Sequence, residues 1–149
     1  MIADGEIVNE YVAKAMSTLS RDQLLQATRV AKEQHYEAGS MILTEGTNAE
    51  SFYIVTKGTV EVVLPRQNQS DVVVVQLGPG KYFGEMEFFH EKKHRASIRA
   101  SEGGPVEVLA IGYDKLDELL SQSDVTRETL HQYADRREAE NVKKRGVTS

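Results

Sequence analysis

Three residues in the middle of the chain are suited to binding a small anion that carries a sugar. Gly84 and Glu85 are adjacent, and Arg95 follows Glu85 by ten residues. A guanidinium group presents a planar fork of donors that fits two phosphate oxygens, and a carboxylate accepts hydrogen bonds from hydroxyl groups. Gly84 can adopt backbone angles that other residues avoid, and a helical turn just after it would direct free N–H groups at a ligand. A phosphate joined to a ribose is the simplest ligand with these features.

The residues around these three resemble a known motif, the phosphate-binding cassette of cyclic nucleotide-binding domains. Such domains occur in the bacterial catabolite activator, in protein kinase A regulatory subunits and in cyclic nucleotide-gated channels. The likeness continues through residues 36–46 and 52–62 and covers residues 19–120 in all. The cassette residues that carry it are Phe83, Gly84, Glu85, Met86, Arg95, Ala96 and Ser97.

This resemblance implies a mainly β fold with flanking helices. The expected architecture is a jelly-roll-like β-roll of about eight strands, with N-terminal helices, a short cassette helix and C-terminal helices. The resemblance also implies that Glu85 binds the ribose 2′-hydroxyl and that Arg95 binds the cyclic phosphate, with help from backbone N–H groups of residues 84–87. The predicted ligand-binding residues are therefore Phe83, Gly84, Glu85, Met86, Glu87, Arg95, Ala96 and Ser97.

Glu87 departs from the family pattern, which has Ala, Gly or Ser at this position. A carboxylate that faced the phosphate would repel it, because like charges in a confined site are poorly screened. Three alternatives are open: Glu87 points to solvent, it pairs with Arg95 when the site is empty, or nucleotide binding has been lost. In the last case the domain would serve protein interaction or dimerisation.

The composition is that of a globular domain without disulfides. The 149 residues are 40% hydrophobic and 28% charged, contain no cysteine and carry a net charge of −5, which argues against a nucleic-acid-binding surface. The longest apolar run, residues 72–75, is far shorter than the roughly 20 residues that cross a bilayer, and the first residues do not resemble a secretory signal. We expect one cytoplasmic domain over residues 1–149, with no membrane contact from this segment.

Periodicity divides this domain into three parts. Helices are predicted for residues 1–34, one of them over residues 7–16 and another opened by a capping box of Ser20 and Gln23. Residues 35–111 form the β-roll, with the cassette at residues 78–100, a tight hairpin at Lys57-Gly58 and a polar loop over residues 65–71. Residues 112–149 form C-terminal helices, the last over residues 125–145. That helix is mostly charged, and we expect it to close over the bound base.

A second motif in the cassette suggests different chemistry. His90, Glu91 and His94 match the HExxH pattern of zinc peptidases, in which two histidines on one helix hold the metal. Two lysines separate Glu91 from His94, and a strand-like segment begins soon after, so a helix of sufficient length does not fit. A charged loop is the preferred interpretation, and a zinc peptidase is the remote alternative. We predict no catalytic residue, no metal site and no enzymatic activity.

The predicted function is a cyclic nucleotide-binding sensor or regulatory module, with the nucleotide as ligand and no cofactor. Family members that prefer cGMP often carry Thr or Ser directly after the cassette arginine, whereas this chain has Ala96, which favours cAMP over cGMP. The other expected partner is an effector protein or a fused domain such as a channel, transporter, kinase or regulator. Oligomerisation through the C-terminal helix is left open.

Overall fold

The computed structural model describes residues 7–66 and 68–144. The predictions for residues 1–6, for Gln67 and for residues 145–149 lie outside these ranges. The helices are α1 (Glu10–Ala15), α2 (Arg21–Val30), α3 (Glu85–Phe89), α4 (Tyr113–Leu120) and α5 (Asp124–Lys144). The strands are β1 (Lys32–Tyr36), β2 (Met41–Leu43), β3 (Ser51–Lys57), β4 (Val60–Arg66), β5 (Gln69–Leu77), β6 (Tyr82–Phe83), β7 (Ser97–Ala100) and β8 (Val106–Gly112).

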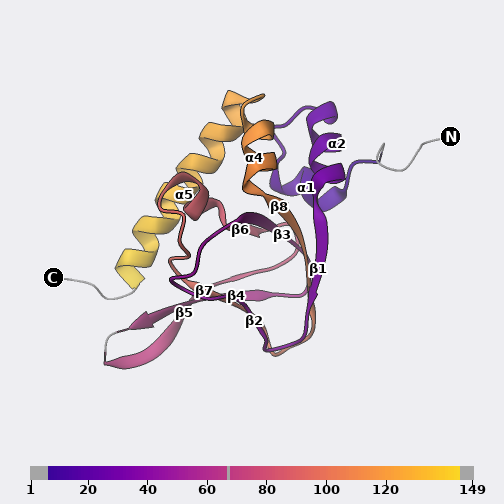
Figure 1. Cartoon of the computed structure of the whole chain (residues 1–149). Coiled ribbons are helices and arrows are strands. Elements are labelled where there is room, and N and C mark those ends of the chain that lie inside the picture. Colours follow the sequence, from indigo (N-terminus) through magenta and orange to yellow (C-terminus); the bar gives the residue numbers. More distant parts are fainter. Residues whose placement is uncertain (1–6, 67, 145–149) are drawn as a thin grey trace.

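The strands form two four-stranded sheets that make up a β-roll. Sheet I has the order β1-β8-β3-β6, and sheet II has the order β2-β7-β4-β5. The strand pairs within both sheets are antiparallel. The helices gather at one end of the roll, and α5 runs along its side (Figure 1). The predicted fold class, a β-roll of about eight strands with flanking helices, is confirmed.

Sheet I separates two hydrophobic cores, because successive side chains of a strand point to opposite faces. On one face, Phe52 and Ile54 of β3 pack with Leu116 and Leu120 of α4 and other helical residues. The next residue of the strand, Val55, belongs instead to the interior of the β-roll. The roll therefore has its own core, and the helices are held by a different one.

The N-terminal helices follow from local capping signals. The Ser20 side chain accepts a hydrogen bond from the Gln23 backbone, and the Gln23 side chain accepts one from the Ser20 backbone, so the predicted capping box is present. The predicted extension of helix to residue 34 is wrong, since β1 begins at Lys32. Its residues pair with β8 from Lys32↔Ala110 to Tyr36↔Val106. The hydrogen bonds of this long-range ladder satisfy the backbone N–H and C=O groups of a polar segment whose sequence does not alternate between apolar and polar residues.

Two predicted connections also differ from the structure. Lys57-Gly58 does not join a hairpin, because β3 pairs within sheet I and β4 within sheet II. The turn at Gly58 instead carries the chain from one sheet to the other. The polar loop predicted over residues 65–71 is mostly strand, since β4 and β5 pair as far as Arg66↔Gln69. This hairpin projects from the roll in Figure 1.

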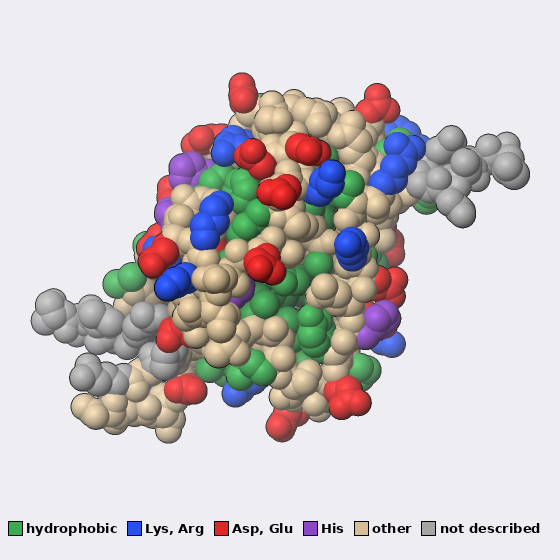
Figure 2. All heavy atoms as spheres, viewed as in Figure 1, with side chains coloured by type: hydrophobic (Ala, Val, Ile, Leu, Met, Phe, Trp, Pro, Cys, Tyr) green, Lys and Arg blue, Asp and Glu red, His purple; other side chains and the backbone are tan. Residues whose placement is uncertain are grey.

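Helix α4 lies within the predicted C-terminal helical segment, and α5 matches its predicted position closely. Thr126, Leu130 and Ala134 of α5 are buried, whereas most of its other side chains are partly or fully exposed. None of the helices in the described ranges combines the length and the apolar composition that a membrane crossing requires. On the face shown in Figure 2, acidic and basic side chains are interspersed and do not gather into one basic patch.

The turn at Gly58 generates a stability prediction. Gly58 has a φ of 80°, and a Cβ on it would lie 2.4 Å from the Pro105 carbonyl oxygen. We expect Gly58→Ala to lower the free energy of unfolding by more than the roughly 1–3 kcal/mol that a positive φ costs a non-glycine residue. Gly46→Ala is the matched control, because Gly46 has a φ of 87° but no atom within 4 Å of a Cβ. Urea denaturation showing equal losses for both variants would contradict the steric argument.

Candidate functional site

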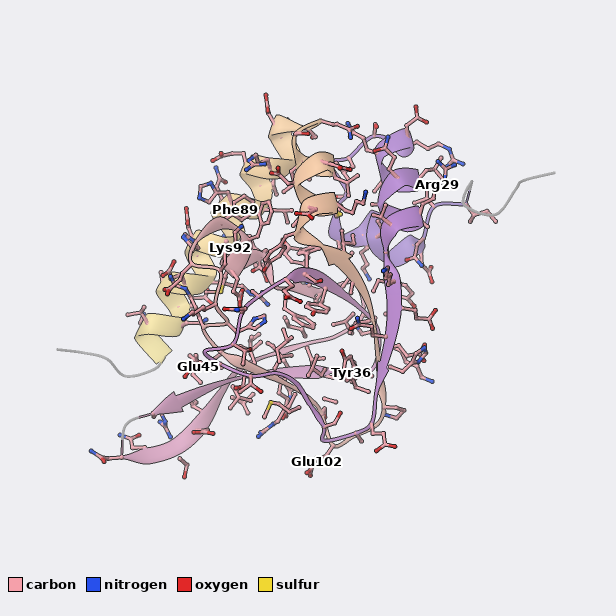
Figure 3. All side chains as sticks on the ribbon, in the orientation of Figure 1. Arg29, Tyr36, Glu45, Phe89, Lys92 and Glu102 are labelled. Atoms are coloured by element: carbon pink, nitrogen blue, oxygen red, sulfur yellow. The ribbon has the colours of Figure 1, made fainter. Side chains whose placement is uncertain are left out.

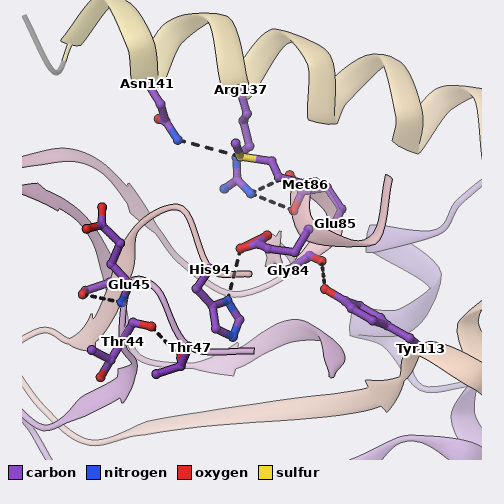
Figure 4. A network of polar contacts seen from close by, with 12 residues as sticks. Thr44, Glu45, Thr47, Gly84, Glu85, Met86, His94, Tyr113, Arg137 and Asn141 are labelled. Atoms are coloured by element: carbon purple, nitrogen blue, oxygen red, sulfur yellow. Dashed lines mark hydrogen bonds and ion pairs between the residues drawn. The ribbon is translucent and has the colours of Figure 1, made fainter. Parts of the chain in front are cut away.

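The cassette helix α3 begins just after Gly84, a position that no other residue fills without strain. Gly84 lies between β6 and α3 with a φ of 95°, and a Cβ there would lie 2.6 Å from the Ser51 carbonyl oxygen. The Tyr113 hydroxyl donates a 2.6 Å hydrogen bond to the Gly84 carbonyl oxygen (Figure 4). Burial raises the pKa of this hydroxyl, so it remains protonated as a donor. The short cassette helix α3 is thus present where it is predicted. The backbone at its start is fixed by the close approach of the Ser51 carbonyl and by the hydrogen bond from Tyr113.

Glu85 is completely buried and is bound by an arginine from the C-terminal helix. Nη1 of Arg137 donates to both carboxylate oxygens of Glu85, at 2.8 and 2.7 Å (Figure 4). Burial raises the pKa of the Glu85 carboxyl, and the charge and hydrogen bonds of Arg137 oppose that rise. Burial lowers the pKa of the Arg137 guanidinium, but Glu85 more than offsets this, so the net shift is upward. The pair joins α3 to α5 across 52 residues of sequence.

Arg137 has a further donor that is available to a ligand. Its Nη2 is buried and has no hydrogen-bond partner among the described residues. The guanidinium carbon lies 5.0 Å from the centroid of the Tyr133 ring, and both side chains line the cavity described below. Since an unpaired buried donor costs free energy, an acceptor on a bound ligand would be favoured here.

Glu87, which departs from the family pattern, is paired within the protein. Its side chain is buried, so the alternative in which it points to solvent is wrong. Oε2 of Glu87 lies 3.1 Å from Nδ1 of His94, whose side chain is also buried. His94 lies in the predicted charged loop, but its contact with Glu87 was not predicted, because nothing in the local pattern indicates that the histidine turns inward.

Arg95, the predicted phosphate ligand, contacts a carboxylate of the C-terminal helix. Its Nη1 donates to Oε1 of Glu138, and its Nη2 lies 3.9 Å from Glu91. The other carboxylate oxygen of Glu138 lies 3.3 Å from Nε2 of His90, which in turn is 3.0 Å from Asp135. The residues predicted to bind the ribose and the phosphate, Glu85 and Arg95, are therefore both engaged by α5.

A cavity of about 160 Å³ lies between sheet II, the cassette and α5. Apolar side chains of sheet II form one wall, and residues of α5 form the opposite one. Its lining residues are Leu43, Val62, Val74, Val75, Phe83, Gly84, Met86, Glu87, Arg95, Ala96, Ile98, Tyr133, Arg136, Arg137, Glu140 and Asn141.

Six of the eight predicted site residues line this cavity, and two do not. Glu85 lies behind it, against Arg137. Ser97 accepts a 3.0 Å hydrogen bond from the Glu45 backbone and so serves the β-roll. The lining residues from α5 were not predicted individually. The prediction that the C-terminal helix closes over the base was the one indication that residues of α5 would line the site.

The histidine motif does not have the geometry of a zinc peptidase. Helix α3 ends at Phe89, so His90 and His94 do not share a helix. His90 contacts α5, whereas His94 contacts Glu87 of α3. Within the described ranges, the one cluster of residues with metal-ligand spacing is Glu33, His35 and Glu107, which lies on β1 and β8 outside the cassette.

Comparison with known proteins defines the class to which this chain belongs. The sequence model of the cyclic nucleotide-binding domain matches residues 33–123, and the chain belongs to that family. The predicted resemblance is confirmed.

Two curated relatives from Drosophila melanogaster are protein kinase components. The cGMP-dependent protein kinase, isozyme 2 forms cD5/T2, is 30% identical over 78% of this chain and 12% of its own length. The type II regulatory subunit of cAMP-dependent protein kinase is 30% identical over 86% of this chain and 33% of its own length. The chain thus spans a third or less of the length of these relatives.

Solved structures show the same fold. The catabolite activator protein of Thermus thermophilus is 24% identical with a TM-score of 0.74, and the match covers 86% of this chain and 59% of that one. The regulatory domain of Toxoplasma gondii PKA, co-crystallised with cAMP, is 17% identical with a TM-score of 0.78, over 89% of this chain and 50% of that one.

The buried ion pair predicts the behaviour of a double-mutant cycle. Arg137→Met removes the counter-charge of Glu85 and should lower the free energy of unfolding by about 3–5 kcal/mol, because a buried carboxylate is left unpaired. Adding Glu85→Gln to the Arg137→Met variant should recover part of the lost free energy of unfolding. Arg136→Met, on the exposed neighbouring residue, should change stability little. Urea denaturation measures the free energy of unfolding of Arg137→Met, of Glu85→Gln and of the double variant. If the losses of the two single variants simply add in the double variant, the contribution of Glu85 to stability does not depend on Arg137.

Proposed function

We propose that this domain binds a cyclic nucleoside monophosphate in the cavity between sheet II, the cassette and α5. The observation that carries the proposal is that Arg95, Gly84 and Arg137 line one cavity whose other wall is apolar. Arg95 binds the cyclic phosphate with help from backbone N–H groups after Gly84. The free Nη2 of Arg137 serves the ribose, Glu85 joins it once α5 moves and exposes its carboxylate, and the apolar side chains of sheet II contact the base.

The contact between Glu87 and His94 supports binding over a domain that has lost its ligand. Repulsion of the phosphate by Glu87 is the main argument for the alternative in which nucleotide binding has been lost. The carboxylate has a hydrogen-bonding partner inside the protein, Nδ1 of His94 at 3.1 Å. Glu87 is therefore accommodated as part of the wall of the site.

We propose cAMP as the preferred ligand. Ala96 lines the cavity directly after Arg95 and offers no hydroxyl to a guanine base. The names of the relatives include both a cGMP-dependent and a cAMP-dependent kinase, so the argument for cAMP rests on Ala96.

We propose that the domain acts as a regulatory module of a larger effector or of a separate partner. Domains of this family are typically regulatory and non-catalytic, and the curated relatives contain much more chain than this one. Because a ligand shifts a conformational equilibrium only by its differential affinity, the signal is the difference in the position of α5 between the empty and the bound states.

A thermal-shift titration with cAMP and cGMP tests the binding proposal. Ligand at ~100 times its dissociation constant should stabilise the fold by about 2.7 kcal/mol. Arg95→Ala should weaken binding by roughly 30-fold or more, because the phosphate loses its charge partner. Arg99→Ala is the control, since Arg99 lies four residues further on, in β7, and pairs with Glu61. No shift with either nucleotide at millimolar concentration, on folded protein, would refute the proposal.

The nucleotide preference is tested at Ala96. Ala96→Thr adds a hydroxyl beside the base and should shift the ratio of cGMP to cAMP affinity toward cGMP by about tenfold, the value of one hydrogen bond. Ala96→Val has a similar shape without the hydroxyl and should leave the ratio unchanged. Calorimetry with both nucleotides measures the ratio, and equal effects of Thr and Val would show that shape alone acts at this position.

A further inference from the structure

The C-terminal helix places a carboxylate on the residue that is assigned to the phosphate. We propose that Glu138 is an intramolecular occupant of the phosphate subsite, which a cyclic nucleotide must displace from Arg95 in order to bind. This inference rests on the proposed function and adds a mechanism of self-inhibition to it.

Glu138 is bound by Arg95 and lies close to a second side chain, His90. Its Oε1 accepts from Nη1 of Arg95, and its Oε2 lies 3.3 Å from Nε2 of His90. A carboxylate and a phosphate are alternative acceptors for the same guanidinium fork. Glu138 occupies one terminal nitrogen of Arg95, so a phosphate that binds the terminal fork competes with it.

The size of the cavity supports the same conclusion. With α5 in this position the cavity holds about 160 Å³, whereas ligand pockets typically measure roughly 300–1,000 Å³. A nucleotide therefore requires the wall formed by α5 to move outward. The structure therefore corresponds to a closed position of α5, with Glu138 in the adjoining cavity that Arg95 also lines.

The contacts that hold α5 against the cassette are mostly polar and aromatic. Asp135 lies 3.0 Å from His90, and the ring of His131 stacks on Phe89 at 4.7 Å between centroids. Phe89 lies beside α5 in Figure 3. Apart from the buried pair of Glu85 and Arg137, ion pairs of this kind can be exchanged for ligand contacts at small net cost, because they are only partly buried.

Closure by Glu138 reduces the apparent affinity for nucleotide. A ligand that binds only the open state has an apparent dissociation constant equal to its intrinsic value divided by the open fraction. Removal of the Glu138 carboxylate raises that fraction. If Glu138 were only a lid contact that supports the bound state, its removal would instead weaken binding.

The test is a calorimetric titration of cAMP into the wild-type chain, Glu138→Ala and Glu128→Ala. Glu128 is an exposed glutamate of the same helix, so its variant matches the change in charge and in helix propensity. We expect Glu138→Ala to bind at least about fivefold more tightly than the wild type, and Glu128→Ala to bind like the wild type. Hydrogen exchange without nucleotide should show faster exchange of α5 amides in Glu138→Ala than in Glu128→Ala.

The outcomes separate this inference from the proposed function. If the wild type binds cAMP and Glu138→Ala binds equally or more weakly, self-occupancy is wrong and the binding function stands. If the three folded proteins bind neither cAMP nor cGMP at millimolar concentration, the proposed function and the self-inhibition that rests on it are both refuted.

Discussion

The structure depends on how one buried carboxylate is neutralised. Glu85 is fully buried at the start of α3, and an ionised group in this environment needs a counter-charge with good geometry. That counter-charge, Arg137, comes from α5 and donates to both carboxylate oxygens. The position of the C-terminal helix is thereby coupled to the cassette, although only a few side chains of that helix are buried. A change at either residue affects both elements.

The acidic side chains in and around the cassette contact donor side chains that the protein itself supplies. Three carboxylates, on Glu85, Glu87 and Glu138, contact Arg137, His94 and Arg95. On the proposed mechanism, the group that the nucleotide replaces is Glu138, because it lies on the element that can move without disturbing the β-roll.

The separation of the two hydrophobic cores explains why such movement is compatible with a stable fold. The interior of the roll is formed by strands of both sheets, whereas the helices pack on the outer face of sheet I. Helix α3 lies at the boundary, since Phe88 belongs to the helical core and Phe83, just before α3, to the interior of the roll. A ligand bound at the cassette can therefore alter the packing of α5 while the sheets keep their register.

The amino-acid sequence by itself determined the features that depend on short-range chemistry. The glycine before α3, the capping box at Ser20, the alternating strands and the extent of α5 all follow from local turn, capping and periodicity rules. The residue types at Glu85 and Arg95 indicated the site, and the resemblance of the surrounding segment indicated the family. Tertiary structure alone decided which strands share a sheet, so that β3 and β4 separate at Gly58.

Tertiary structure also decided the partner of each charged group. Arg137 reaches Glu85 across 52 residues and Glu138 reaches Arg95 across 43, and no local pattern encodes such contacts. His94 and Glu87 are only seven residues apart, but their contact requires the loop after α3 to turn inward. Charge pairing depends on distances in space and on burial, which are set only when the helices pack against the roll.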